Sequence, residues 1–241
     1  MSPSERPTHR SATEPSADQA AYRSAVGSLL YAGIISRPDI LYAACQLSQY
    51  LSDPAESHMR MTINVFRYVA GTLDRKLTFK KDSDSTSHPL CIYSDASYAN
   101  NLPDRRSFTG VIAFFHGCPI AWVSTKQSSV TSSTTEAEYV ALTHAVKSLT
   151  WLEVLRRNLG ITARGKPTLL GDNVSSHFLV RNASIHRRSK HIDVRYHFIR
   201  ERHEKGEFTL GFVSGKDNPA DLLTKALSPE LNSYFSSLIF R

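Results

Sequence analysis

The sequence predicts an α/β fold in which a mixed five-stranded sheet is flanked by helices and preceded by a small helical region. Three observations support this prediction. Apolar residues recur at helical spacing through the first third of the chain, three short apolar runs separated by turn signals follow, and helix-like and strand-like stretches then alternate. A meander followed by strand–helix alternation predicts one sheet containing both antiparallel and parallel neighbours.

The first third of the chain predicts a tail followed by three helices. Residues 1–21 are rich in Ser, Pro, Thr and charged residues, a composition typical of disorder. Residues 22–80 carry three stretches of helix-spaced apolar residues, the second opened by Pro38 and the third stopped at Gly71. Residues 81–88 are polar, which predicts a linker.

The remainder predicts one domain, residues 89–228, and a short C-terminal tail, residues 229–241. Its expected elements, in order, are strands at 90–94, 108–115 and 119–124, a long helix at about 135–158, a fourth strand before Asp172, a basic helical stretch and a fifth strand at 208–213. This order gives three antiparallel strands first and alternating helix and strand afterwards.

Asp95 ends the first apolar strand, in the stretch Cys-Ile-Tyr-Ser-Asp-Ala-Ser-Tyr-Ala that begins at Cys91. A carboxylate at the end of a buried strand is costly unless something pairs with it, and divalent cations commonly partner clustered carboxylates. Asp95 therefore predicts a metal-binding cluster to which later acidic residues contribute.

The long helix offers two candidates for this cluster, Glu136 and Glu138. Steps of three and four residues from Glu138 reach Ala141, Leu142, Ala145, Leu149 and Leu152, an apolar stripe. The same steps from Glu136 soon reach polar residues, so Glu136 is expected to face solvent near the positive helix N-terminus. We favour Glu138, and Glu136 stays the alternative.

Asp172 and Asp221 are the other two candidates. Asp172 follows a short apolar strand and precedes a short helix, while Asp221 lies in the first turns of a helix after the last strand. If the strands of Asp95 and Asp172 are parallel neighbours, both aspartates emerge at one carboxyl edge, where open α/β sheets place their sites. Asn173 and Asn218, beside these positions, are candidates for orienting water or a ribose hydroxyl.

Four carboxylates in one cleft predict bound cations, because they cannot all stay ionised without them. Two metal ions would relieve the repulsion and organise the attack of water on a phosphodiester. Magnesium suits a site built entirely from oxygen ligands, and manganese can substitute for it. The residue pattern therefore predicts a nuclease with Asp95, Glu138, Asp172 and Asp221 as metal ligands and catalytic residues.

Several motifs occur in one order over most of the chain: Tyr22-Arg-Ser-Ala-Val-Gly-Ser-Leu-Leu-Tyr, Arg37-Pro-Asp-Ile, Phe66-Arg-Tyr-Val-Ala-Gly-Thr, Tyr93-Ser-Asp-Ala, Asp104-Arg-Arg-Ser-Phe-Thr-Gly, Ser132-Ser-Thr-Thr-Glu-Ala-Glu-Tyr, Asp172-Asn, Lys190-His-Ile-Asp-Val-Arg-Tyr-His-Phe-Ile-Arg and Pro219-Ala-Asp-Leu-Leu-Thr-Lys. Through them the chain resembles the C-terminal part of a copia-type retrotransposon Pol polyprotein, meaning the end of its reverse transcriptase followed by its ribonuclease H domain.

The resemblance implies a ribonuclease H-like sheet domain preceded by a thumb or connection remnant of the reverse transcriptase. It also implies cleavage of the RNA strand of RNA/DNA hybrids, with the four acidic residues as the family's quartet and other parts of a retroelement polyprotein as partners. Many members carry a histidine in the loop before the last aspartate, whereas residues 213–220 here contain Lys216 and no histidine. Lys216 would be a poor proton shuttle at neutral pH, which lowers the expected turnover.

The chain contains no Asp-Asp dipeptide such as a polymerase palm requires, so no polymerase activity is expected. Its formal net charge of +7 suits a polyanionic partner. A run of basic residues just before the helix expected between the last two strands supplies the candidate nucleic-acid contacts, Arg187, Arg188, Lys190 and His191. A solvated helix face is the alternative interpretation of this run.

No apolar signal core opens the sequence and no apolar run approaches a membrane span, so we expect an intracellular protein, cytoplasmic or nuclear, without a membrane partner. Two other functions remain open at this point. One is a non-catalytic nucleic-acid-binding remnant of a decayed element. The other is a transposase or integrase on the same fold, which would need three acidic residues rather than four.

Overall fold

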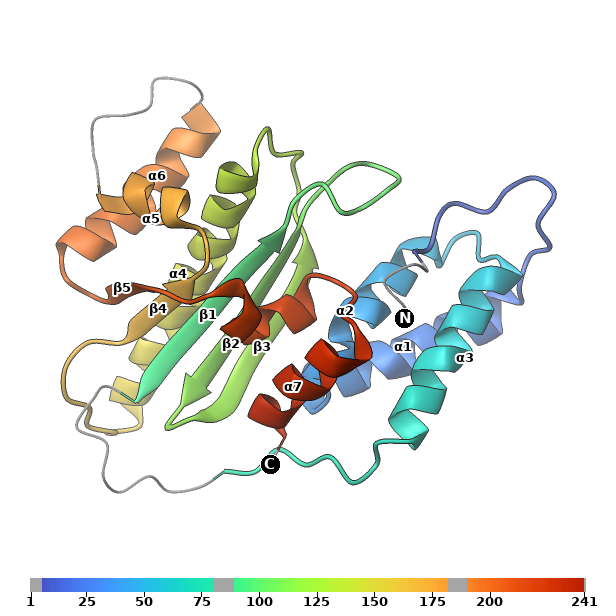
Figure 1. Ribbon diagram of the computed structural model, residues 1–241, viewed down its shortest axis with the longest axis horizontal. Helices are drawn as coiled ribbons and strands as arrows, with labels where there is room; N and C mark the ends of the chain where they lie inside the picture. The colour runs from blue at the N-terminus through green and yellow to red at the C-terminus, as the bar shows by residue number, and fades with distance from the viewer. Residues whose placement is uncertain (1–5, 80–88, 182–189, 241) are drawn as a thin grey trace.

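The computed structural model of the protein describes residues 6–79, 89–181 and 190–240, with only the backbone described for 190–196 (Figure 1). Its central element is a five-stranded sheet in the order β3-β2-β1-β4-β5. The strands are β1 (Leu90–Ser97), β2 (Phe108–Phe115), β3 (Cys118–Lys126), β4 (Thr168–Gly171) and β5 (Thr209–Phe212). β1 to β3 are antiparallel, and β4 pairs in parallel with both β1 and β5. The predicted fold class, a mixed ribonuclease H-like sheet flanked by helices, is confirmed.

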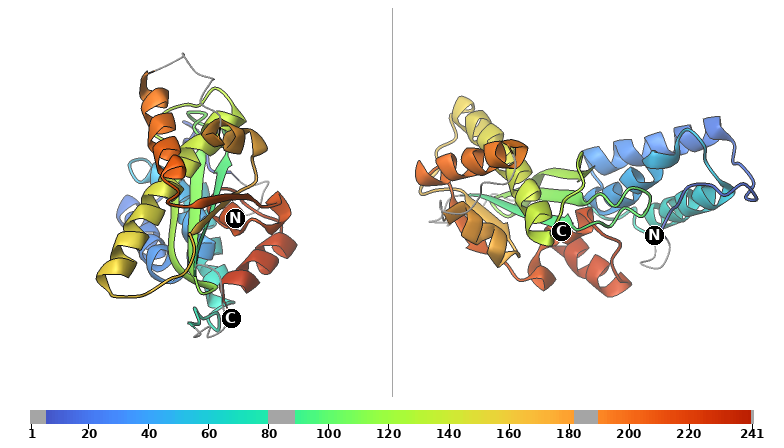
Figure 2. Two further views of the ribbon diagram at one scale, coloured as in Figure 1. Left: turned by 90° about the vertical axis from the view of Figure 1, so that its left-hand side faces the viewer. Right: turned by 90° about the horizontal axis from the view of Figure 1, so that it is seen from above.

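Both faces of the sheet are covered, which is why β2 reads as an almost continuous apolar run. On one face, β2 contributes Val111 to a core shared with Leu142 and Leu149 of α4 (Thr134–Asn158). On the other face, Ile112 packs with Phe235 of α7 (Pro229–Ile239). Alternate residues of a strand point to opposite faces, so β2 serves both cores. Figure 2 shows the sheet between these two helices.

Helices α5 (Val174–Arg181) and α6 (Lys190–Glu204) follow β4 and lie on the same side of the sheet as α4. Two short 3-10 segments, η2 (Gly215–Asp217) and η3 (Pro219–Leu223), come after β5. Asn218 caps η3 by accepting a hydrogen bond from the Ala220 amide at 3.2 Å. η3 packs against β2 and β1, and it thereby carries Asp221 back to the centre of the sheet.

The predicted helical region consists of α1 (Gln19–Ile35), α2 (Pro38–Leu47), the 3-10 turn η1 (Ser48–Tyr50) and α3 (Glu56–Ala70). It lies beside β3, the edge strand of the sheet (Figure 1). The Trp122 indole donates to the Gly33 carbonyl at 2.8 Å, and the Cys45 thiol donates to the Ser124 carbonyl at 3.3 Å. Covering an edge strand in this way keeps its unpaired backbone groups from pairing with other chains.

The described part of the segment 1–21, whose composition predicts disorder, lies against the helical region. The Tyr50 hydroxyl donates to the Pro7 carbonyl at 2.8 Å, and Ser16 forms a β-bridge with Ala55. α1 already begins at Gln19, because the Asp18 carboxylate caps its first amides. The composition of a segment does not reveal its contacts with distant parts of the chain. The contacts with η1 and with the residue that caps α3 are of this kind, so the composition did not predict them.

The segment 229–241, expected to be a tail, contains α7. Ser228 caps this helix and Pro229 occupies its first turn. Phe235 is fully buried and Ile239 is nearly so, in the core shared with η3 and β2. None of the helices in the described ranges combines the length and the apolar character needed to cross a bilayer.

Candidate metal centre

The structure brings three of the predicted acidic residues together at one edge of the sheet. Each of Asp95, Glu138 and Asp172 offers a carboxylate oxygen, and these three oxygens all lie within 4.8 Å of one another. Asp95 and Glu138 are buried and Asp172 is half-buried. A donor set made only of carboxylate oxygens in this compact arrangement fits a hard divalent cation such as magnesium.

The parallel pairing of β1 and β4 places Asp95 beside Asp172. Tyr93 lies opposite Leu170 in this pairing, and each aspartate lies two residues further along its chain. Sequence analysis predicted this neighbourhood but placed Asp95 at the end of a strand. In the structure β1 continues to Ser97, because its pairing with β2 extends to Phe108. Asp95 is therefore held by strand pairing on its β2 side, opposite Gly110.

The two glutamates of α4 have different environments. The Glu136 carboxylate accepts hydrogen bonds from the Ser132 amide at 2.6 Å and the Ser132 hydroxyl at 2.8 Å. Glu138 is 9% exposed and lies in the acidic cluster. The helical-face argument for Glu138 agrees with this placement, since Ala141, Leu142 and Leu149 are buried on the same side of α4.

Asp221 reaches the same region from η3 and is paired with a lysine. The Lys225 ammonium lies 2.9 Å from Asp221 Oδ1 and 3.8 Å from Asp95 Oδ2. Sequence analysis missed Lys225 as a site residue, although it ends the motif that begins at Pro219. Its position four residues after Asp221 was the available signal, because residues four apart lie on the same side of a helical turn.

The segment that carries Asp221 is anchored on both sides. The Asn218 side-chain amide donates to the Ser94 carbonyl at 3.0 Å, and the Ser124 hydroxyl donates to the Leu223 carbonyl at 2.6 Å. Asn218 is fully buried with both amide atoms engaged, so it holds the segment in place and is not free to orient water. The side-chain oxygen of Asn173 caps α5 by accepting a hydrogen bond from the Ser176 amide.

Burial and mutual repulsion shift the pKa values of the acidic groups upward. Burial raises the pKa of Glu138, and the charges of Asp95 and Asp172 raise it further. Burial and Asp95 also raise the pKa values of Asp172 and Asp221, against the lowering effect of Lys225. The pKa of Lys225 is itself raised, since the attraction of Asp95 and Asp221 exceeds the effect of its burial. The cluster is thus short of positive charge.

Curated relatives that match most of this chain are transposon proteins. The retrovirus-related Pol polyprotein from transposon RE1 of Arabidopsis thaliana is 38% identical over 222 residues, 92% of this chain. The corresponding polyprotein from transposon TNT 1-94 of Nicotiana tabacum is 39% identical over 207 residues, 86% of this chain. The chain belongs to the family of retrovirus-related Pol polyproteins of transposons. It spans 15% of the length of each of these relatives.

Other comparisons with this Pol-family chain are less extensive. A secreted RxLR effector protein 161 of Plasmopara viticola is 38% identical over 136 residues, 56% of this chain and 94% of that protein. No protein-family model matches the chain.

Among solved structures, LC11-RNase H1 in complex with an RNA/DNA hybrid is 17% identical, with a TM-score of 0.40, over 56% of this chain and 93% of that one. Foamy viral protease-reverse transcriptase in complex with RNA/DNA hybrid is 11% identical, with a TM-score of 0.44, over 85% and 26%.

The candidate nucleic-acid contacts of the Pol-family chain fall outside the described side chains. Arg187 and Arg188 lie in the range 182–189, and Lys190 and His191 lie at the start of α6, where only the backbone is described. Their role therefore stays a prediction. Lys216, in the loop where the resemblance led us to expect a histidine, is exposed in η2. The neighbouring Gly215 lies so close to Asp172 that a Cβ atom there would be 3.1 Å from Oδ2.

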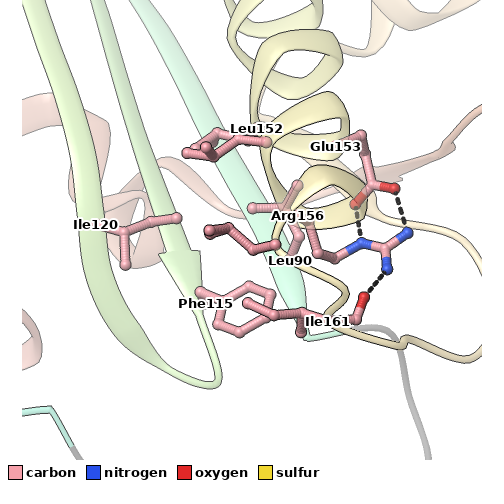
Figure 3. Close-up of a pocket in the computed structure, with 9 residues that line it drawn as sticks. Leu90, Phe115, Ile120, Leu152, Glu153, Arg156 and Ile161 are labelled. Carbon is pink, nitrogen blue, oxygen red and sulfur yellow. Dashed lines mark hydrogen bonds and ion pairs between the residues drawn. The ribbon is translucent and has the colours of Figure 1, made fainter.

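An apolar cavity of about 120 Å³ lies near the start of β1, away from the acidic cluster (Figure 3). Leu90, Phe115 and Leu152 line it, and a 2.9 Å ion pair between Glu153 and Arg156 lies at its side. Both charged groups of this pair are engaged with each other, and the Arg156 guanidinium also donates to the Ile161 carbonyl. The cavity thus lacks the convergent polar groups that chemistry requires, in contrast to the acidic cluster.

Proposed function

We propose that this chain is a ribonuclease H that hydrolyses the RNA strand of RNA/DNA hybrids in a metal-dependent reaction. The observation that carries the proposal is the meeting of three carboxylates, from β1, α4 and the end of β4, within 4.8 Å. The placement of Asp221 beside them and membership of the Pol family support it. We also propose that residues 22–80 are a thumb or connection remnant and that residues 89–228 form the nuclease domain.

In this proposal Asp95, Glu138, Asp172 and Asp221 hold two divalent cations, magnesium in the cell. When bound, such ions would supply a nucleophilic water and neutralise charge on the phosphate. The pairing of β1 with β2 holds the Asp95 carboxylate in place. The Lys225 ammonium reduces the repulsion between Asp95 and Asp221. The basic residues Arg187, Arg188, Lys190 and His191 would contact the phosphate backbone.

Cleavage of a hybrid labelled on its RNA strand tests the proposal. The wild-type chain should cut it in magnesium and leave it intact in EDTA, and Asp95→Asn should lower the rate at least about a hundredfold. Glu136→Gln is the matched control, since Glu136 bonds Ser132 outside the cluster, and it should retain the wild-type rate within about threefold.

An intact hybrid with the wild-type chain and magnesium, under conditions in which a reference nuclease cuts it, would overturn the proposal. If binding that weakens with salt persisted in that case, the chain would be a nucleic-acid-binding remnant without catalysis. Cleavage of duplex DNA instead would favour a transposase or integrase.

A further inference from the structure

The segment η3 lies closer to β2 than side chains normally allow. Gly110 faces Asp95 across the β1–β2 pairing. A Cβ atom at Gly110 would lie 2.7 Å from the Ala220 carbonyl oxygen and 2.7 Å from Thr224 Cγ2. Real Cβ atoms do not approach neighbours so closely, so only glycine permits this contact. The methyl group of Thr224 consequently packs over the strand position next to Asp95.

The Thr224 side chain is fully buried and its orientation is fixed. With its methyl group against Gly110, its hydroxyl donates a hydrogen bond to Asp95 Oδ2. The Asp221 carbonyl lies 3.3 Å from the same hydroxyl, and the Thr224 amide donates to that carbonyl at 3.2 Å. Thr224 thus contacts Asp95 through its side chain and the backbone of Asp221 through both its amide and its hydroxyl.

We propose that Thr224 is a positioning residue that orients the Asp95 carboxylate for cation binding and couples it to the segment bearing Asp221. This inference rests on the proposed function. A donor to one carboxylate oxygen fixes the plane of the carboxylate and so directs its remaining lone pairs toward the other ligands. Hydrogen-bonded partners of metal ligands typically contribute ten- to a hundredfold to metal affinity or activity, about the range expected here.

A purely packing role for Thr224 predicts different behaviour from a positioning role. Valine has the shape of threonine and would fill the same space over Gly110, but it donates no hydrogen bond. Serine keeps the hydroxyl and loses the methyl group. Thr224→Val and Thr224→Ser therefore separate the hydrogen bond to Asp95 from the contact with Gly110.

The experiment measures Mn²⁺ binding by titration calorimetry, together with the hybrid cleavage rate and the melting temperature in EDTA. Thr224→Val should weaken Mn²⁺ binding at least about tenfold and lower kcat more than it changes KM for the hybrid. Thr224→Ser should stay within about threefold of the wild type in both. Thr143→Val is the matched control, because the buried Thr143 hydroxyl donates to the Tyr139 carbonyl within α4 and it should leave Mn²⁺ binding unchanged.

Three outcomes would overturn the inference. Equal Mn²⁺ affinity of Thr224→Val and the wild type would remove the positioning role while leaving the proposed nuclease intact. A loss in Thr224→Ser with Thr224→Val close to the wild type would assign the effect to packing of the methyl group. Failure of the wild-type chain to bind Mn²⁺ and to cut the hybrid would overturn the proposed function, and this inference with it.

Discussion

Glu138 combines burial with two acidic neighbours, and this combination makes the cation-free site unfavourable. Its folded-state pKa is raised by burial and by Asp95 and Asp172. At pH values between its unfolded and folded pKa values, the folded protein binds more protons than the unfolded chain does. Stability therefore falls as the pH rises through that window. A bound cation removes the penalty by pairing with the ionised form.

A first prediction follows for Glu138→Gln, which mimics the protonated acid. In EDTA its melting temperature should match that of the wild type near pH 4 and exceed it near pH 8. One pKa unit corresponds to about 1.4 kcal/mol, or about 3–6 °C for a chain of this size. Thermal unfolding across pH measures the difference. Glu136→Gln should show no such gain, and an equal gain in both variants would contradict the explanation.

At the residue scale the sequence predicted which acidic side chains lie together, but not the residues that contact them. Glu138 was distinguishable from Glu136 because a helix of 25 residues has a readable apolar face. Thr224 and Lys225 were not identified, because they follow the 5-residue η3, where no apolar periodicity marks a face; only the spacing of four from Asp221 pointed to Lys225. Their roles arise from contacts with β1, which is 129 residues away along the chain.

The element that most constrains the site is η3, which depends on Gly110 for its close approach to the sheet. Any side chain at position 110 would force the Ala220 carbonyl and Thr224 away from β2. Asp221 lies between these two residues, so a shift of η3 moves a carboxylate of the cluster.

A second prediction is that Gly110→Ala destabilises the protein by about 2 kcal/mol or more, since overpacking against backbone costs about 1–3 kcal/mol or above. It should also lower hybrid cleavage at least about tenfold through Asp221. Urea unfolding and cleavage assays measure both effects. Gly27→Ala is the control: no atom lies within 4 Å of its Cβ position in α1, and it should stabilise by about 0.5–1 kcal/mol. Wild-type cleavage by Gly110→Ala would refute the argument.

Element types were predictable from local patterns, whereas several boundaries were not. The three N-terminal helices and all five strands appear where their apolar spacing placed them. β1 runs three residues beyond its predicted end, because pairing with β2 extends it past the apolar run. The contacts of residues 6–18 and the burial of α7 are tertiary, so composition alone did not reveal them.

The whole molecule is held together by a buried polar network between the helical region and α7. The Asp39 carboxylate pairs with Arg37 at 2.8 Å and Arg75 at 3.2 Å, and it accepts a hydrogen bond from the Tyr68 hydroxyl at 2.8 Å. The side-chain oxygen of Asn232 in α7 lies 3.0 Å from the same Tyr68 hydroxyl. Leu41 of α2 shares an apolar core with the sheet and η3. We therefore expect the two regions to unfold together.

A third prediction tests this expectation with Asp39→Ala, which leaves the buried Arg37 and the half-buried Arg75 without their carboxylate. It should cost about 3–5 kcal/mol, the usual effect of breaking a buried ion pair. Urea unfolding, followed by both Trp fluorescence and circular dichroism, should show one shifted transition. Asp53→Asn removes an exposed pair with Arg10 and should change little. Two separate transitions in the wild type would show that the regions are independent.

The positions of the acidic ligands along the chain have a consequence for synthesis. Asp95, Glu138 and Asp172 emerge from the ribosome before Asp221, and the apolar core that seats η3 also needs Phe235 and Ile239 of α7. Proteins fold progressively as they are made, so the sheet and α4 can assemble while η3 is still missing. A growing chain therefore cannot seat Asp221 beside the other three carboxylates until translation has passed α7.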